Sequence, residues 1–164
     1  MVALFDIADV NKSASAFDPE KLAWVNQQHM MKAAPERLAR YLRPQLAALG
    51  IEEADDRHLA AVAKAQQTRV KTLKEMAAVS LYFFQDSISF DERAAAKHLT
   101  AETLPVLKAL VEALDKLASW QAPALHEAVT GVATALGVGL GKVAQPLRVA
   151  VSGRRVSPPL FESM

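Results

Sequence analysis

Cysteine is absent from this 164-residue sequence, which excludes disulfide bonds and metal sites built on thiolates. Long hydrophobic runs are missing as well, since no window reaches the ~18 uninterrupted apolar residues that a transmembrane helix needs. The first residues, MVALFDIADVNK, lack the basic start and the long apolar core of a signal peptide. Together these absences predict a cytoplasmic protein without a membrane partner.

An excess of one charge is also missing. Lys and Arg number 19 against 18 Asp and Glu, which leaves a formal net charge of +1. The overall charge therefore does not indicate nucleic-acid binding, and any contact with RNA has to come from a local patch. With 51% hydrophobic residues, the chain can bury a core as one domain or as two small ones.

The common catalytic and nucleotide-binding signatures are absent too. The four histidines lie far apart in the sequence, so they could bind a metal only if distant segments converged. No GxSxG, Walker A or GxGxxG motif occurs. The stretch GVGLGK at 137–142 lacks the P-loop spacing and a Ser or Thr after the lysine, and we interpret it as a helix end and a turn. The sequence thus predicts no catalytic, cofactor-binding or metal-binding residue.

Apolar residues recur with the ~3.6-residue period of a helix in every long segment, which predicts an all-α fold. Helix starts are indicated at Asp18-Pro19, Pro35, Asp55-Asp56, Asp91 and Pro123. We also expect helices over 68–84 and from Thr100 to Ser119.

A polar break at 85–90 indicates a boundary between two small helical subdomains, 1–86 and 87–164. Residues 1–18 are interpreted as an extended lead-in. In the first subdomain we expect Trp24, Phe83 and Phe84 to pack in the core rather than to stack on bases.

The C-terminal stretch has an unusual charge pattern. From Ala128 to Phe161 there is no Asp or Glu, whereas Lys142, Arg148, Arg154 and Arg155 are positively charged. A basic surface held between Gly and Pro corners suits the binding of phosphates and bases. The alternative is an ordinary helix followed by a loop with solvated arginines.

Three stretches of the sequence carry a family resemblance. GKVAQPLRVAVSGRRVSPPLFE at 141–162 resembles the C-terminal signature of bacterial glutamyl-tRNA synthetases. FDPEKLAWVNQQHM at 17–30 and RVKTLKEMAAVSLYFF at 69–84 resemble two further stretches of that family, in the same order. The part that is matched is the anticodon-binding region.

The resemblance implies two helical subdomains that form a cage around the anticodon of tRNA(Glu). The parent enzyme would be an ATP-dependent ligase that uses ATP and Mg²⁺. The two ATP-site signatures of the family, HIGH-like and KMSKS-like, are absent from this sequence. We therefore expect the chain to be part of a longer ligase and to be inactive and without a cofactor when alone. We also expect a monomer with no DNA partner. A free-standing helical RNA-binding or protein-adaptor domain derived from that region is the alternative.

The resemblance also implies roles for individual residues. Arg148 matches an arginine directed at the first anticodon base, and Ser157, Pro158 and Leu160 match a loop that packs on the anticodon. Gln145 and Pro146 are expected to shape the start of the helix that carries Arg148.

Arg69 matches the position expected to read the last anticodon base, with Lys71 as the rival. The alternative is an ion pair of Arg69 with Glu75 or another acid. Lys142 is expected to meet phosphate. Arg154 and Arg155 add positive charge beside the loop.

Overall fold

The computed structural model describes residues 6–9 and 16–164, and every regular element within these ranges is a helix. This confirms the predicted all-α class. The α-helices are α1 (Pro19–Lys32), α2 (Pro35–Ala47), α3 (Asp56–Gln66), α4 (Leu73–Ser80), α5 (Glu92–His98), α6 (Leu104–Leu114), α7 (Ala122–Ala135) and α8 (Leu140–Ser152). Short 3-10 helices are formed by Ile7–Asp9, Leu81–Phe83, Ala101–Thr103 and Leu160–Glu162. Most of the lead-in expected over 1–18 lies outside the described residues. In the described part of the chain, no helix is both long and apolar enough to span a membrane.

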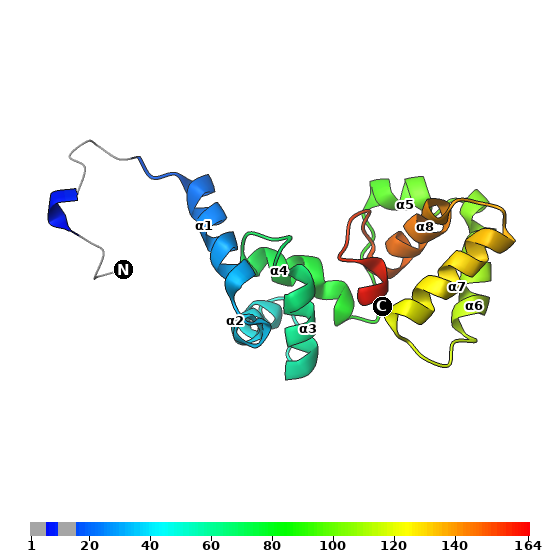
Figure 1. The fold of residues 1–164 in the computed structure, drawn as a ribbon, viewed down its shortest axis with the longest axis horizontal. Helices are drawn as coiled ribbons and strands as arrows, with labels where there is room; N and C mark the ends of the chain where they lie inside the picture. The colour runs from blue at the N-terminus through cyan, green and yellow to red at the C-terminus, as the bar shows by residue number, and fades with distance from the viewer. Residues whose placement is uncertain (1–5, 10–15) are drawn as a thin grey trace.

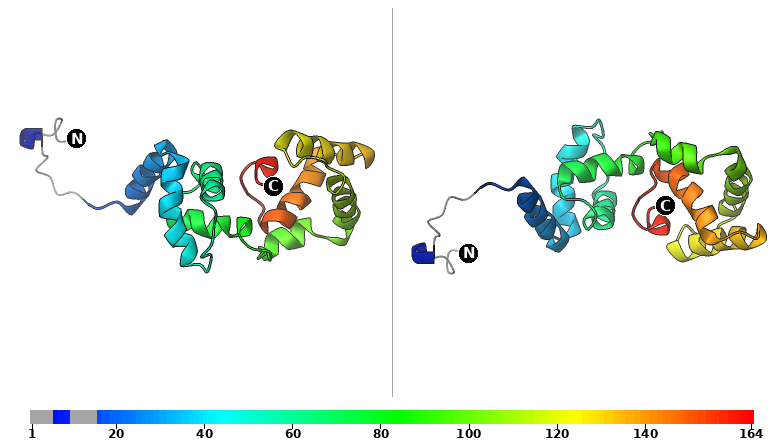
Figure 2. Two further views of the ribbon diagram at one scale, coloured as in Figure 1. Left: turned by 90° about the horizontal axis from the view of Figure 1, so that it is seen from below. Right: turned by 90° about the horizontal axis from the view of Figure 1, so that it is seen from above.

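The helices form two groups that lie side by side along the long axis of the molecule, α1–α4 and α5–α8 (Figure 1). Views from below and above show the same separation, with the C-terminal segment returning to the middle of the molecule between the groups (Figure 2). The chain crosses from one group to the other between Phe84 and Asp91. The subdomain boundary at 86/87 falls in this crossing and stays a prediction.

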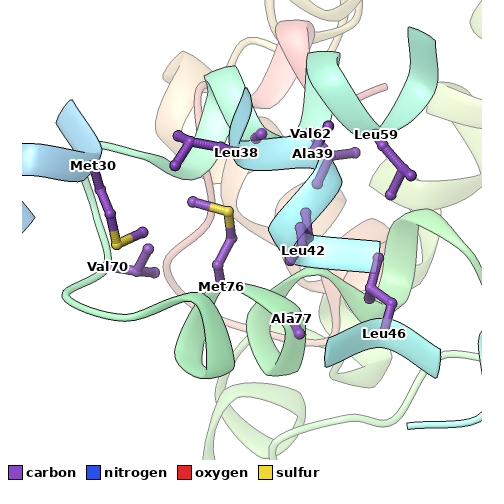
Figure 3. Close-up of a cluster of buried hydrophobic side chains, with 11 residues drawn as sticks. Met30, Leu38, Ala39, Leu42, Leu46, Leu59, Val62, Val70, Met76 and Ala77 are labelled. Atoms are coloured by element: carbon purple, nitrogen blue, oxygen red, sulfur yellow. The ribbon is translucent and has the colours of Figure 1, made fainter. Parts of the chain in front are cut away.

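The first group is held together by a cluster of buried apolar side chains from α1 to α4, called here the first cluster. Leu42, Leu46, Leu59 and Met76 are at most 1% exposed. Burial of a side chain of this size contributes roughly 1.5–3 kcal/mol. Figure 3 shows this cluster, with the side chains of α2 lying between those of α3 and α4.

The second group has its own cluster, built from α6, α7, α8 and the C-terminal segment. Leu110, Leu125, Val129 and Val143 are at most 1% exposed, and Leu160 joins them at 4%. The segment that follows α8 is therefore anchored in a hydrophobic core.

Helix starts follow the local signals in the sequence. Asp18, Asp55 and Asp91 each precede a helix, and each carboxylate accepts a hydrogen bond from a first-turn N–H, at 2.9, 3.0 and 2.7 Å respectively. A carboxylate at this position satisfies an N–H that has no partner inside the helix. These predicted helix starts are confirmed.

Helix α4 spans Leu73–Ser80 and is followed by the 3-10 helix Leu81–Phe83, so the helix expected over 68–84 is wrong for residues 68–72. The Thr72 hydroxyl caps α4 by accepting the Glu75 N–H at 3.1 Å, and Glu75 Oε2 accepts the Lys71 N–H at 2.8 Å. The preceding residues form a turn instead, and Val70 is buried to 2% exposure. Arg69 and Lys71 consequently lie on a loop rather than on a helix.

Trp24 is 56% exposed, so the expectation that it packs in the core is wrong. Leu22 is 54% exposed as well, so neither of these two residues near the start of α1 is buried. Helix α1 turns Met30 inward instead. Phe83 and Phe84 are half-buried against the first cluster, which agrees with their expected packing role.

Two helix boundaries in the second group also differ from expectation. Helix α6 ends at Leu114 rather than at Ser119, because the Leu117 N–H bonds to the Leu114 carbonyl in a tight turn. Helix α8 begins at Leu140, so Gln145 and Pro146 lie in its interior and not at its start. Proline has no N–H to donate, and its buried ring is accommodated at the cost of one helical hydrogen bond.

Candidate nucleic-acid interface

The loop after α8 is held in shape by side chains of that helix. Arg148 Nη1 donates hydrogen bonds to Ser157 Oγ at 2.6 Å, to the Pro158 carbonyl at 3.0 Å and to the Ser157 carbonyl at 3.3 Å. Its Nε donates to Gln145 Oε1 at 3.2 Å, and Gln145 Nε2 donates to the Arg155 carbonyl at 3.1 Å. Two residues of α8 thus fix the loop over residues 155–158.

These contacts bear on what Arg148 can do. Nε and Nη1 are used on the protein itself, whereas Nη2 has no hydrogen-bond partner among the residues that the structure describes. The side chain is half-buried in α8. Arg148 is therefore first a support for the loop, and only one of its nitrogens remains for a ligand.

The junction between α8 and the loop is closely packed. The Ser152 hydroxyl donates to the Arg148 carbonyl at 2.7 Å and accepts the Arg154 N–H at 3.3 Å. Gly153 has a φ of +69°, and a Cβ added there would lie 2.2 Å from the Ser89 carbonyl oxygen. The Gly153 carbonyl accepts the Asp91 N–H at 2.8 Å. Glycine is required here by backbone conformation and by space.

Arg69 lies on the loop between α3 and α4, and its neighbour Val70 anchors that loop. The side chain of Val70 points into the first cluster, next to Met30 of α1 (Figure 3). The Arg69 N–H bonds to the Gln66 carbonyl at 2.9 Å. The backbone that carries Arg69 is thus tied to the core on one side and to the end of α3 on the other.

Helix α1 holds the same loop from outside. Asn26 Nδ2 donates to the Lys71 carbonyl at 2.6 Å, and Gln27 Nε2 donates to the Thr68 carbonyl at 3.4 Å. These two amides bracket the loop on either side of Arg69. The exposed Arg69 side chain therefore projects from a backbone that is held at both ends.

Residues from both groups meet at a cavity of about 170 Å³, called here the central cavity. Arg69 reaches it from the first group, and Arg154, Ser157 and Pro158 reach it from the second. Its remaining lining residues are Gln66, Val70, Glu75, Val79, Tyr82 and Val156. Among the described residues Arg69 forms no ion pair with Glu75 or with another acid, so the alternative for this arginine is not found.

Tyr82 lines the central cavity, and the positive charges of Arg69 and Arg148 affect the pKa of its phenol. Its hydroxyl oxygen is buried and finds no hydrogen-bond partner in the described part of the chain. Burial raises the pKa of the phenol above its ordinary value of 10.0, while the nearby Ser163 hydroxyl and the positive charges of Arg148 and Arg69 oppose that shift. The phenol is therefore neutral near pH 7.

The other residues singled out in the sequence are more scattered. Lys71 and Lys142 are exposed and lie outside the lining of the central cavity. Leu160 is buried in the second cluster at 4% exposure, where it supports the loop from below. Its place is in the core, and not on a surface that RNA could reach.

A second hollow, of about 450 Å³, adds two basic residues that the sequence patterns did not single out. Arg93 and Lys97 of α5 face it together with Arg154 and Arg155. Neither Arg93 nor Lys97 belongs to the three stretches with a family resemblance. Their spacing of four residues on one helix is the only signal for them in the sequence.

Comparisons with known proteins show which family the chain resembles. The profile of the family described as "Anticodon binding domain" matches residues 37–164. "Glutamate--tRNA ligase 1" of Alkalilimnicola ehrlichii is 49% identical over 164 residues, which are 100% of this chain and 35% of that protein. "Glutamate--tRNA ligase 2" of Halorhodospira halophila is 48% identical over 160 residues, covering 98% of this chain and 34% of that protein.

The solved structures give the same result. The crystal structure of a glutamate tRNA ligase from Elizabethkingia meningosepticum, in complex with its amino acid, superposes with a TM-score of 0.86 at 29% identity. The match covers 98% of this chain and 32% of that one. The chain thus spans about a third of the length of the curated relatives that it matches.

Proposed function

The chain belongs to the anticodon-binding domain family, and on that premise we propose that it reads the anticodon of tRNA(Glu) as part of a ligase that attaches glutamate to this tRNA. In such an enzyme ATP and Mg²⁺ are handled by residues outside this chain. We assign no catalytic residue here, and the chain alone is expected to have no ligase activity. The whole enzyme would act as a monomer in the cytoplasm.

One observation carries the proposal: arginines and a polar loop from two helical groups line the same cavity. Anticodon bases are single-stranded, so their edges and faces are open to protein groups. A guanidinium on a braced loop can donate to a base edge without first losing conformational freedom. We assign Arg69 to the last anticodon base, with Ser157 on the wall that the second group forms. Pro158 is less than 2% exposed, so it supports that wall from within the fold.

The remaining residues take supporting roles in this proposal. Arg148 keeps Ser157 and Pro158 in position through Nη1 and offers Nη2 to the RNA. Lys71 and Lys142 are exposed and suited to phosphate oxygens. The free-standing alternative has no support in the comparisons, because the relatives are named as ligases.

The experiment compares two anticodon stem-loops that differ in the last anticodon base, with binding followed by fluorescence anisotropy. The unaltered chain should prefer the glutamate anticodon by about 1–3 kcal/mol. Arg69→Gln should remove most of this preference, because the base-directed donors are lost.

Lys64→Gln is the matched control, since it removes one exposed charge from α3 outside the central cavity. It should leave the preference intact. Equal binding of both RNAs by the unaltered chain would refute anticodon reading. If Arg69→Gln keeps the preference, only the role assigned to Arg69 is refuted, and anticodon reading by the chain is not.

A further inference from the structure

Four cations surround the 450 Å³ hollow between α5 and the loop after α8, which is called here the basic hollow. Arg93 and Lys97 come from α5, and Arg154 and Arg155 come from the loop. All four residues are exposed. Its other lining residues are Asp91, Ala94 and Val156.

Positive charges outnumber negative ones in the lining of the basic hollow. Asp91 is the only acid in the lining, and its Oδ1 accepts the Ala94 N–H at 2.7 Å as the cap of α5. In the described ranges, the ion pair found joins Arg43 and Asp56, far from the hollow. Four positive charges held beside a single carboxylate repel each other and attract anions.

The stability of α5 does not explain the arrangement. Arg93 is in the first turn, where the helix dipole favours a negative side chain. Lys97 is in the last turn, where a cation is favourable, but the two like charges are four residues apart on one face and oppose each other. An anion in the hollow would offset the repulsion between Arg93 and Lys97.

The basic hollow adjoins the central cavity. Arg154 and Val156 line both spaces. A nucleotide whose base enters the central cavity carries a phosphodiester group on each side of its ribose, and that backbone has to leave the cavity along its rim.

We propose that the basic hollow binds backbone phosphates of the same RNA whose bases enter the central cavity, with Arg93 and Lys97 as the anchoring residues on α5. The proposal rests on the proposed function, because it takes anticodon RNA as the ligand. In this proposal the basic hollow raises the affinity for RNA of any sequence, and the central cavity selects the base.

The test uses the double variant Arg93→Gln/Lys97→Gln and the two stem-loops described above, titrated between about 50 and 200 mM salt. The control is Lys108→Gln/Lys116→Gln, which removes two exposed lysines on and after α6 that line neither space. Loss of two phosphate contacts should reduce the slope of log affinity against log salt by roughly 1.4–1.8. At low salt both RNAs should bind about tenfold more weakly, while the preference between them is kept.

The control variant should show the same slope of log affinity against log salt as the unaltered chain. The proposal is overturned if the Arg93/Lys97 variant keeps the full slope, or if it loses the preference between the two RNAs, since the residues would then select bases. It is also overturned if the control loses as much affinity as the double variant. Equal binding of both RNAs by the unaltered chain is the separate outcome that contradicts the proposed function.

Discussion

Replacing Gly153 with alanine tests the close approach behind the C-terminal loop. Gly137 is a matched control, because its φ of +65° is close to the +69° of Gly153 and both glycines follow helices of the second group. An added Cβ at Gly153 would lie 2.2 Å from the Ser89 carbonyl oxygen and 2.9 Å from Ile88 Cγ2. At Gly137 nothing lies within 4 Å. The two variants share the backbone cost, so the difference between them isolates the steric contact.

The magnitude follows from these distances. A left-handed backbone costs an alanine about 1–2 kcal/mol. A stiffer unfolded chain offsets roughly 0.4–1 kcal/mol of that cost, so Gly137→Ala should lower the free energy of unfolding by about 1 kcal/mol. At Gly153 the Ser89 backbone has to move away as well, which costs about 1–3 kcal/mol as overpacking. The same movement strains the hydrogen bond from the Asp91 N–H, so the total loss should be about 3–5 kcal/mol.

Urea unfolding of the 164-residue chain, followed by far-UV circular dichroism, measures both losses. We expect Gly153→Ala to lower the free energy of unfolding by at least ~2 kcal/mol more than Gly137→Ala, with similar slopes against urea. Equal losses in the two variants would show that the contact with Ser89 has no energetic effect, and the reasoning would be wrong.

Two further predictions concern the walls of the central cavity. Arg148→Ala should weaken stem-loop binding about tenfold more than Arg154→Ala, because it removes charged hydrogen bonds that hold the loop; equal losses in fluorescence anisotropy would contradict this. Tyr82→Phe should flatten the alkaline end of the stability curve. Because the pKa of Tyr82 is raised in the folded chain, the neutral phenol contributes stability below pH 10 that is lost as the pH rises through the folded pKa. Urea unfolding at several pH values between about 9 and 11 measures the free energy of unfolding of both proteins. The unaltered chain should lose stability relative to Tyr82→Phe as the pH rises, and a constant difference would contradict the prediction.

Local chemistry explains why so much of the fold could be predicted. The caps at Asp18 and Asp91 involve only the next few residues, so their effect is visible in the sequence. The late start of α4 had a signal as well, since Thr72 and Glu75 have the spacing of a capping box. The helical period over 68–84 concealed it, because Val70 fits the same apolar pattern whether it lies on a helix or on a turn that points into the core.

The site was less accessible to prediction because it depends on contacts between distant segments. The sequence identifies Arg148 as a candidate, but it cannot show that Nη1 is engaged nine residues downstream at Ser157. The resemblance implies that Leu160 belongs to a loop that meets RNA, yet its side chain is buried in a core whose residues come from distant segments. Arg93 and Lys97 join Arg154 and Arg155 around one hollow only because α5 packs against α8, and the sequence does not show this packing.

The two amides of α1 that bracket the Arg69 loop have a consequence for how the base preference proposed for Arg69 can change. Asn26 and Gln27 donate to main-chain carbonyls, which every amino acid possesses. Thr68, Arg69 and Lys71 can therefore be exchanged for other residues without removing an acceptor from the brace. The shape of the loop and its chemistry are thus separable: substitutions can retune which base is preferred while the scaffold beneath them remains the same.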